Sequence, residues 1–130
     1  MPKITKSNLL SELLKYVPEF KKIHEKEKED HDCGDTIVMG DFHTFTEEAV
    51  KKRKTKLVKR IADFLTRSYA EGDEYTKEVI ITGFFEGMEI RASAYFYRFL
   101  RNPLQKDVIT HYKGYMNPEW NSLFQKIINK

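Results

Sequence analysis

The spacing of apolar residues predicts helices along most of the chain. Between residues 56 and 88 apolar side chains recur every three or four positions in two segments, separated by Glu71-Gly72-Asp73. Two such faces pack against each other when a short turn joins the helices, so the pattern predicts a central antiparallel helix hairpin. The side chains expected to form its buried contact are Leu57, Ile61, Phe64, Leu65, Ile81, Phe84, Phe85 and Met88.

The turn of this hairpin carries its own signals. Gly72 suits the position just past a helix end, where a left-handed backbone is favoured. Asp73 is a good N-cap because its carboxylate accepts hydrogen bonds from the free amides of the next helix.

Apolar residues from Leu9 to Val17 predict a first helix that follows Ser7. Pro18 interrupts it and is acceptable in the first turn of a second helix, in which Phe20 and Ile23 are expected to be buried. An acidic stretch that contains Cys33 and Gly34 then predicts a loop.

The next segment, 36–39, is short and apolar and is interpreted as a buried extended link. Asp41 then caps a third helix, although Thr44 and Glu47 form a competing capping box. The basic run that begins at Lys51 breaks the apolar pattern, which predicts a bend before the hairpin.

Two Asn-Pro pairs, at 102–103 and 117–118, predict the starts of the last two helices, with asparagine as the cap and proline at the first helical position. Alternating strand patterns are scarce. The chain is therefore predicted to be all-α, a single domain over residues 1–130 with about six or seven helices around the hairpin.

Composition fits a compact, cytoplasmic domain. Apolar residues make up 40% of the chain and charged residues 33%, with Cys33 the single cysteine. One cysteine excludes an internal disulfide and agrees with a reducing compartment. No apolar run approaches the roughly 20 residues that span a bilayer, and the N-terminal stretch lacks the apolar core of an export signal, so neither membrane insertion nor export is expected.

Charge is unevenly distributed. Residues 1–50 hold 7 Lys and 11 Asp or Glu, whereas residues 51–130 hold 16 Lys or Arg and 9 Asp or Glu. Acidic and basic faces of this kind favour a charged macromolecular partner, although a uniformly solvated surface is the simpler interpretation.

The basic run from Lys51 to Arg60 is the densest cluster of one charge, with seven Lys or Arg in ten residues. Such a run can bind nucleic-acid phosphates, and a nucleic-acid-binding module is the alternative function. No aromatic residues interleave with it to stack on bases, which favours a solvated helix junction. Its cations are Lys51, Lys52, Arg53, Lys54, Lys56, Lys59 and Arg60.

Motifs for catalysis, cofactors and metals are absent from the sequence. There is no nucleophile elbow, phosphate loop or dinucleotide fingerprint, so neither an enzyme nor a cofactor is expected. The histidines and Cys33 lack the spacing of zinc ligands, so no metal is expected. Glu86 is the one carboxylate within an apolar run, and burial there would make it a site candidate. The simpler expectation is that it hydrogen-bonds a neighbouring helix end or faces solvent, and so serves the fold.

Four segments, at 17–20, 38–42, 69–73 and 79–88, together resemble an uncharacterised family of small helical bacterial proteins; the resemblance covers residues 7–90. Its members look like the immunity halves of contact-dependent toxin systems. The resemblance therefore implies a protein that binds and silences a cognate toxin domain.

Nuclease toxins expose cationic side chains that hold phosphates, and carboxylates can cover such a site. The acidic stretch is therefore predicted to bind the toxin, through Glu29, Asp30, Asp32, Asp35 and Asp41. Tyrosines offer anchors for tight binding, and the candidates are Tyr95, Tyr97, Tyr112 and Tyr115.

Overall fold

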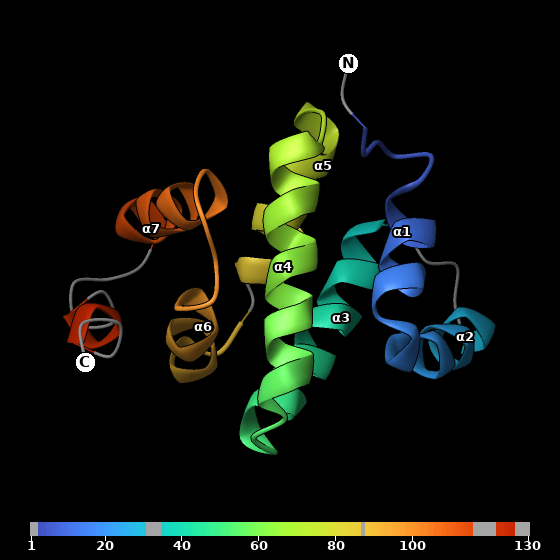
Figure 1. Ribbon diagram of the computed structural model, residues 1–130, viewed down its shortest axis with the longest axis horizontal. Helices are drawn as coiled ribbons and strands as arrows, with labels where there is room; N and C mark the ends of the chain where they lie inside the picture. Colours follow the sequence, from blue (N-terminus) through green and yellow to red (C-terminus); the bar gives the residue numbers. More distant parts are fainter. Residues whose placement is uncertain (1–2, 31–34, 87, 116–121, 127–130) are drawn as a thin grey trace.

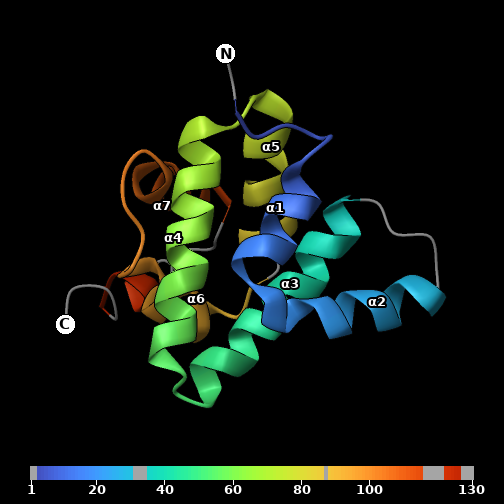
Figure 2. The same cartoon turned by 45° about the vertical axis from the view of Figure 1, so that its right-hand side comes forward.

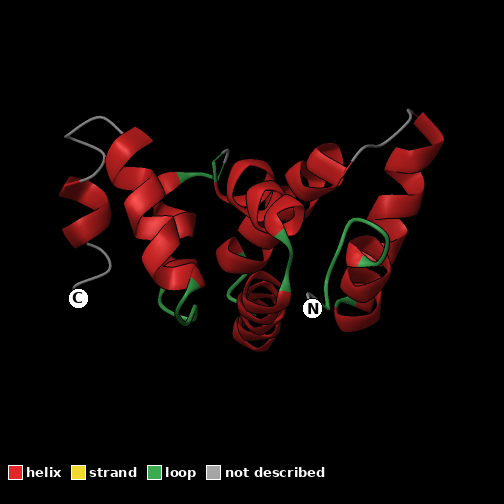
Figure 3. Cartoon of the chain, turned by 90° about the horizontal axis from the view of Figure 1, so that it is seen from above, coloured by secondary structure: helices red, strands yellow, loops and turns green. Residues whose placement is uncertain are grey.

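The computed structural model describes residues 3–30, 35–86, 88–115 and 122–126, and over these residues the chain is all-α, as predicted (Figure 3). The elements are α1 (Leu9–Tyr16), the 3₁₀-helix η1 (Pro18–Phe20), α2 (Lys21–Asp30), α3 (Asp35–Lys51), α4 (Thr55–Glu71), α5 (Glu74–Val79), the π-helix η2 (Ile80–Phe85), α6 (Ile90–Tyr97) and α7 (Leu104–Tyr115), followed by a short helix over 122–126. None of the described helices combines the length and apolar character that a bilayer crossing requires.

Helix α4 is the centre of the fold. It packs against α1, α3, α5, α6 and α7. In Figure 1 it runs vertically, with α6 and α7 on one side and α1 and α2 on the other. Figure 2 shows α3 crossing below α1 and meeting α4 at the α3–α4 turn.

The core is a chain of aromatic rings that joins both ends of the sequence. Phe42 lies 5.1 Å from Phe20 and 5.5 Å from Phe84, and Phe96 lies 5.5 Å from Phe84, measured between ring centroids. Seven of the eight residues predicted to form the hairpin contact are buried, and Ile81 is partly buried. Local spacing thus identified the core correctly.

The pairing of two helices as a central hairpin stays a prediction. The segment after the 71–73 turn is α5 followed by η2, and η2 makes its largest contact with α3. In η2 the consecutive residues Phe84 and Phe85 are both buried. The hydroxyl of Tyr112 donates to the Phe85 carbonyl over 2.8 Å and lies 2.6 Å from the Ser93 hydroxyl. Tyr112 therefore satisfies a backbone oxygen at the end of the π-helix, where the α-helical pattern is interrupted.

Proline and asparagine mark helix boundaries as predicted, with one shift. α1 ends at Tyr16 and the chain turns at Pro18 into η1 and α2. Asn102 accepts a hydrogen bond from the Lys106 amide over 3.1 Å, so it caps α7, but the helix begins at Leu104, one residue after Pro103. The second pair, at 117–118, lies outside the described residues.

The start of the third helix differs from the prediction. α3 begins at Asp35, so segment 36–39 is helical rather than extended, and Asp41 lies inside the helix rather than at its cap. Val38, Met39 and Phe42 are buried. Their spacing of one, three and four residues matches one face of a helix, and this tertiary burial overrides the local preference of Gly40 for a helix end.

Helix α3 ends in a Schellman motif, which produces the predicted bend. The Lys54 amide donates to the Ala49 carbonyl (2.9 Å) and the Arg53 amide to the Val50 carbonyl (3.1 Å). Arg53 occupies the position that usually holds glycine, with φ of 56°. A left-handed backbone costs an L-residue roughly 1–2 kcal/mol, so the arginine is retained at the expense of stability.

Gly72 follows α4 with φ of −86° and ψ of 156°, so its backbone is extended and the predicted left-handed conformation is wrong. The glycine is needed for space: an added Cβ would lie 2.5 Å from the Ser68 carbonyl oxygen and 2.8 Å from the Thr76 methyl. The crowding therefore comes from the end of α4 and the start of α5. The N-terminal segment is hydrogen-bonded to the same turn: the Ile4 amide donates to Glu71, and the Ile4 carbonyl accepts from Asp73 and from the Thr76 hydroxyl.

Asp73 caps α5 as predicted, and its cap gives a pH-dependent contribution to stability. Its carboxylate accepts from the Thr76 amide over 2.9 Å, and this hydrogen bond lowers the pKa of Asp73 below its usual value. A lowered pKa in the folded state means that the stabilisation is present above the ordinary Asp pKa of about 4 and is lost as pH falls through the folded-state pKa.

We therefore expect Asp73→Asn, which keeps a capping group without a titratable charge, to be less stable than the wild type at pH 6. Wild type and variant should converge as the pH falls below about 4. Urea unfolding at a series of pH values measures this difference. A difference that stays constant over the whole range would contradict the assignment.

Candidate functional site

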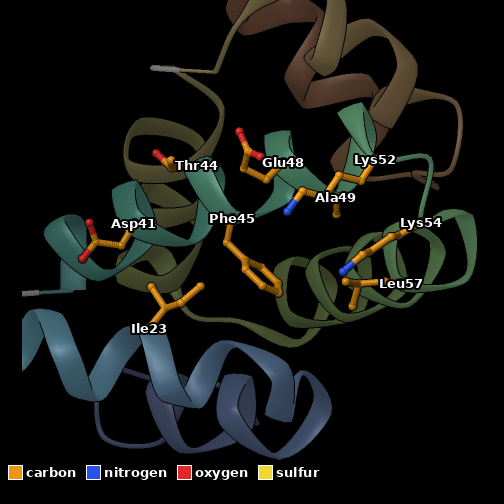
Figure 4. A pocket seen from close by; sticks show the side chains of 9 residues that line it. All are labelled: Ile23, Asp41, Thr44, Phe45, Glu48, Ala49, Lys52, Lys54 and Leu57. Carbon is orange, nitrogen blue, oxygen red and sulfur yellow. The ribbon is translucent and has the colours of Figure 1, made fainter.

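An apolar groove opens between α2, α3 and the start of α4, with a volume of about 320 Å³ (Figure 4). Three consecutive helices contribute to it, and the groove forms where they pack against one another. Its lining residues are Ile23, Asp41, Thr44, Phe45, Glu48, Ala49, Lys52, Lys54 and Leu57.

The floor of the groove is an extension of the core. The Phe45 ring is partly buried and lies 5.6 Å from Phe20 and 6.3 Å from Phe42, stacked on the latter at 17°. Ala49 and Leu57 beside it are buried. Because these side chains are held by close packing, the floor is preorganised for a ligand.

Ile23 forms one wall and is the exposed large apolar side chain of the described residues, with 38% of its surface accessible. The prediction that it is buried is wrong. Phe20 and His24, four residues apart, take the inward positions and their rings lie 6.3 Å from each other. Ile23, three residues after Phe20, lies at the edge of the same helix face, where its side chain lines the groove and stays exposed.

The rim carries both charges. Asp41 lies at the end of the groove next to Ile23, and Lys52 and Lys54 lie at the opposite end, with Glu48 between them (Figure 4). No ion pair joins these four side chains to any described residue. An apolar centre with an unpaired charged rim is the general arrangement of a protein-binding surface.

Of the acidic residues predicted to bind a partner, Asp41 is the one that the structure places, and it lies on this rim. Glu29 and Asp30 belong to α2 and Asp35 begins α3, but their side chains, like the whole of Asp32, lie outside the described part of the chain. The prediction of a continuous acidic surface stays a prediction.

The basic run is divided among different surroundings. Arg60 forms two hydrogen bonds of 2.7 Å with Glu19, and this pair raises the pKa of Arg60 and lowers the pKa of Glu19. The Lys59 ammonium lies 5.7 Å from the Phe99 ring centroid. Lys52 and Lys54 line the groove, whereas Lys51 and Arg53 line a separate cleft. The run is therefore not one uniform cationic face.

Among the residues that the structure describes, no three His, Cys, Asp or Glu side chains lie close enough together to hold a metal ion. His31 and Cys33 fall outside them. Glu86 lies 3.8 Å from His111 between side-chain atoms, and its carboxylate is about one-third exposed. This contact between α7 and the residue that follows η2 gives Glu86 a structural neighbour.

The four tyrosine candidates have different surroundings. Tyr112 is buried and hydrogen-bonded, so it cannot serve as a surface anchor. Tyr97 is partly buried, with its ring 5.5 Å from Phe124. Tyr95 lines the cleft near Arg53. The side chain of Tyr115 lies outside the described residues.

Sequence reasoning missed the groove because its key residues, Ile23 and Phe45, read as ordinary core positions. One signal in the sequence could have indicated the groove. Ile23 and His24 are followed by a wholly charged segment, so α2 has too few apolar residues to bury both of these side chains. A helix with so few apolar residues covers only part of the core edge.

Over its described residues the chain is an all-α protein that carries an apolar groove with a charged rim. The chain belongs to the family described as Domain of unknown function (DUF7674), which matches residues 10–119. No curated protein and no solved structure matches the chain.

Proposed function

We propose that this protein is an immunity protein that binds a toxin domain made by the same cell and occludes its active site in the cytoplasm. The toxin partner is suggested by the resemblance of residues 7–90 to immunity proteins. The observation that supports a binding role is the groove around Ile23 and Phe45, with its exposed apolar wall and rigid aromatic floor.

The carboxylates on the groove rim indicate which charges a partner would carry. Asp41 and Glu48 form no ion pair with the residues that the structure describes, so a toxin surface that carries Lys or Arg would supply a partner. The cationic phosphate-binding side chains of a nuclease fit this description, and an apolar toxin residue would fill the space over Phe45. Inhibition then follows from steric exclusion, without catalysis by the immunity protein.

The test is binding to the C-terminal domain encoded immediately upstream. We expect the wild type to form a stable complex and to restore growth on co-expression. Ile23→Glu should weaken this complex by at least about 30-fold, because it places an unpaired charge in the apolar centre of the interface. The matched control is Thr110→Glu, at an exposed position of α7 on the far side of α4.

Thr110→Glu should bind as the wild type does, and both variants should unfold within about 0.5 kcal/mol of it because both positions are exposed. Equal binding by Ile23→Glu would exclude the groove as the interface. A neighbour that is not toxic, or that the wild type does not bind, would exclude the immunity function.

The alternative is a nucleic-acid-binding module that uses the run from Lys51 to Arg60. It requires an affinity whose logarithm falls linearly with the logarithm of salt concentration. Anisotropy titrations with mixed DNA and RNA at low salt test this alternative, and a lack of binding would exclude it.

A further inference from the structure

A second cleft, separate from the groove, lies where the end of α3 and the start of α4 meet α6. Its volume is about 690 Å³, within the range of small-molecule sites. The residues that line it are Val50, Lys51, Arg53, Thr55, Glu89, Arg91, Ala92 and Tyr95. It thus joins two residues of the basic run to an arginine about forty positions away.

The arginine side chains fall into two groups, those that make an ion pair or another polar contact with a described residue and those that do not. Of the six in the chain, four make an ion pair or another contact: Arg60, Arg67, Arg98 and Arg101. The side chains of the other two, Arg53 and Arg91, contact no described carboxylate, ring or hydrogen-bond acceptor. Both unpartnered arginines line this cleft.

The cleft has an excess of positive charge. Lys51, Arg53 and Arg91 face a single carboxylate, that of Glu89. This carboxylate is already engaged, because it accepts hydrogen bonds of 3.0 Å from the backbone amides of Arg91 and Ala92 at the start of α6. The three cationic groups are therefore left for a ligand.

The backbone conformation of Arg53 also supports a binding role for its side chain. Its left-handed conformation would be free of strain for glycine, yet an arginine stands there. Strained residues are often retained where the side chain is used for binding. Arg53 is thus a position where stability is sacrificed and where the side chain lines a cationic cleft.

We propose that this cleft binds nucleotide phosphates, either of a free nucleotide or of a single strand. Lys51, Arg53 and Arg91 would hold the phosphate oxygens, since guanidinium groups bind phosphate through paired hydrogen bonds. A phosphate carries more charge and more acceptor oxygens than a carboxylate and suits a cleft lined by three cations better. Tyr95, partly exposed at the same cleft, provides a ring on which a base stacks.

The test uses the full chain with three probes at low salt: ATP, a labelled single strand of about twelve nucleotides, and a poly-glutamate peptide. Arg53→Gly and Arg91→Gln should each weaken phosphate binding at least about tenfold. The control Lys106→Gln removes an equally exposed, unpartnered charge from α7 and should leave the affinity within about twofold.

Arg53→Gly separates binding from folding. Because it relieves the left-handed strain, its Tm should rise by roughly 2 to 4 °C while its affinity falls. Binding of ATP assigns the site to free nucleotides, and binding of the strand alone assigns it to nucleic acid; both uphold the phosphate site.

Three outcomes overturn the proposal. One is failure of the wild type to bind either phosphate probe. Another is wild-type affinity in Arg53→Gly and Arg91→Gln. The third is equal competition by poly-glutamate, which would identify the cleft as a surface for an acidic protein. None of these outcomes bears on the groove, so the immunity function can fail or stand independently.

Discussion

Phe84→Ala is expected to lower the free energy of unfolding by about 3 to 5 kcal/mol, the range for removal of a fully buried aromatic ring. Phe84 has no accessible surface. Its ring centroid lies 4.8 Å from Phe85 and 5.5 Å from both Phe42 and Phe96, so it links η2 to α3 and α6. Truncation leaves a cavity bordered by three rings, none of which can collapse without disturbing the others.

Urea denaturation measures this loss, and Thr82→Ala is its control within the same π-helix. Thr82 is exposed and its hydroxyl donates only to the Glu78 carbonyl. The control should change stability by less than about 0.5 kcal/mol. A loss below about 1 kcal/mol for Phe84→Ala would show that this ring is not a central element of the core.

Gly72→Ala is expected to destabilise the protein by about 1 to 3 kcal/mol, the usual effect of forcing an atom into a packed site. The added methyl group would lie 2.5 Å from a backbone oxygen, which cannot move as a flexible side chain can. Gly72→Asn should be as harmful, because it adds the same Cβ. If the position were left-handed, asparagine would be tolerated instead.

Gly40→Ala provides the comparison for thermal or urea unfolding. Gly40 lies inside α3 and a Cβ there meets no atom within 4 Å. Alanine should stabilise the helix by about 0.5 to 1 kcal/mol. If Gly72→Ala and Gly40→Ala had the same effect, the crowding around the α4–α5 turn would be refuted.

The two proposed surfaces meet at the α3–α4 turn. Lys52 and Lys54 line the groove, whereas Lys51 and Arg53 line the cleft. Alternate residues of one basic run thus belong to different cavities, because the backbone reverses direction there. Ile23→Glu and Arg53→Gly should accordingly affect different ligands, the first a protein partner and the second a phosphate group.

Local patterns determined the class of fold and much of the core. The spacing of Leu57, Ile61 and Leu65 reports one helical face, Pro18 ends a helix because it lacks an amide hydrogen, and Asp73 caps because its carboxylate reaches a nearby amide. Each of these effects acts within a few residues, so the sequence alone is sufficient to predict it.

The positions that the sequence pattern placed wrongly depend on how the helices pack. Ile23 is exposed because Phe20 and His24 occupy the core edge, and Gly72 is required because Ser68 and Thr76 leave no room for a Cβ at the α4–α5 turn. Arg53 and Arg91 line one cleft only because α6 packs beside the α3–α4 turn. Periodicity identifies which residues can be buried, but only tertiary packing selects which of them are covered and which far-apart charges share a surface.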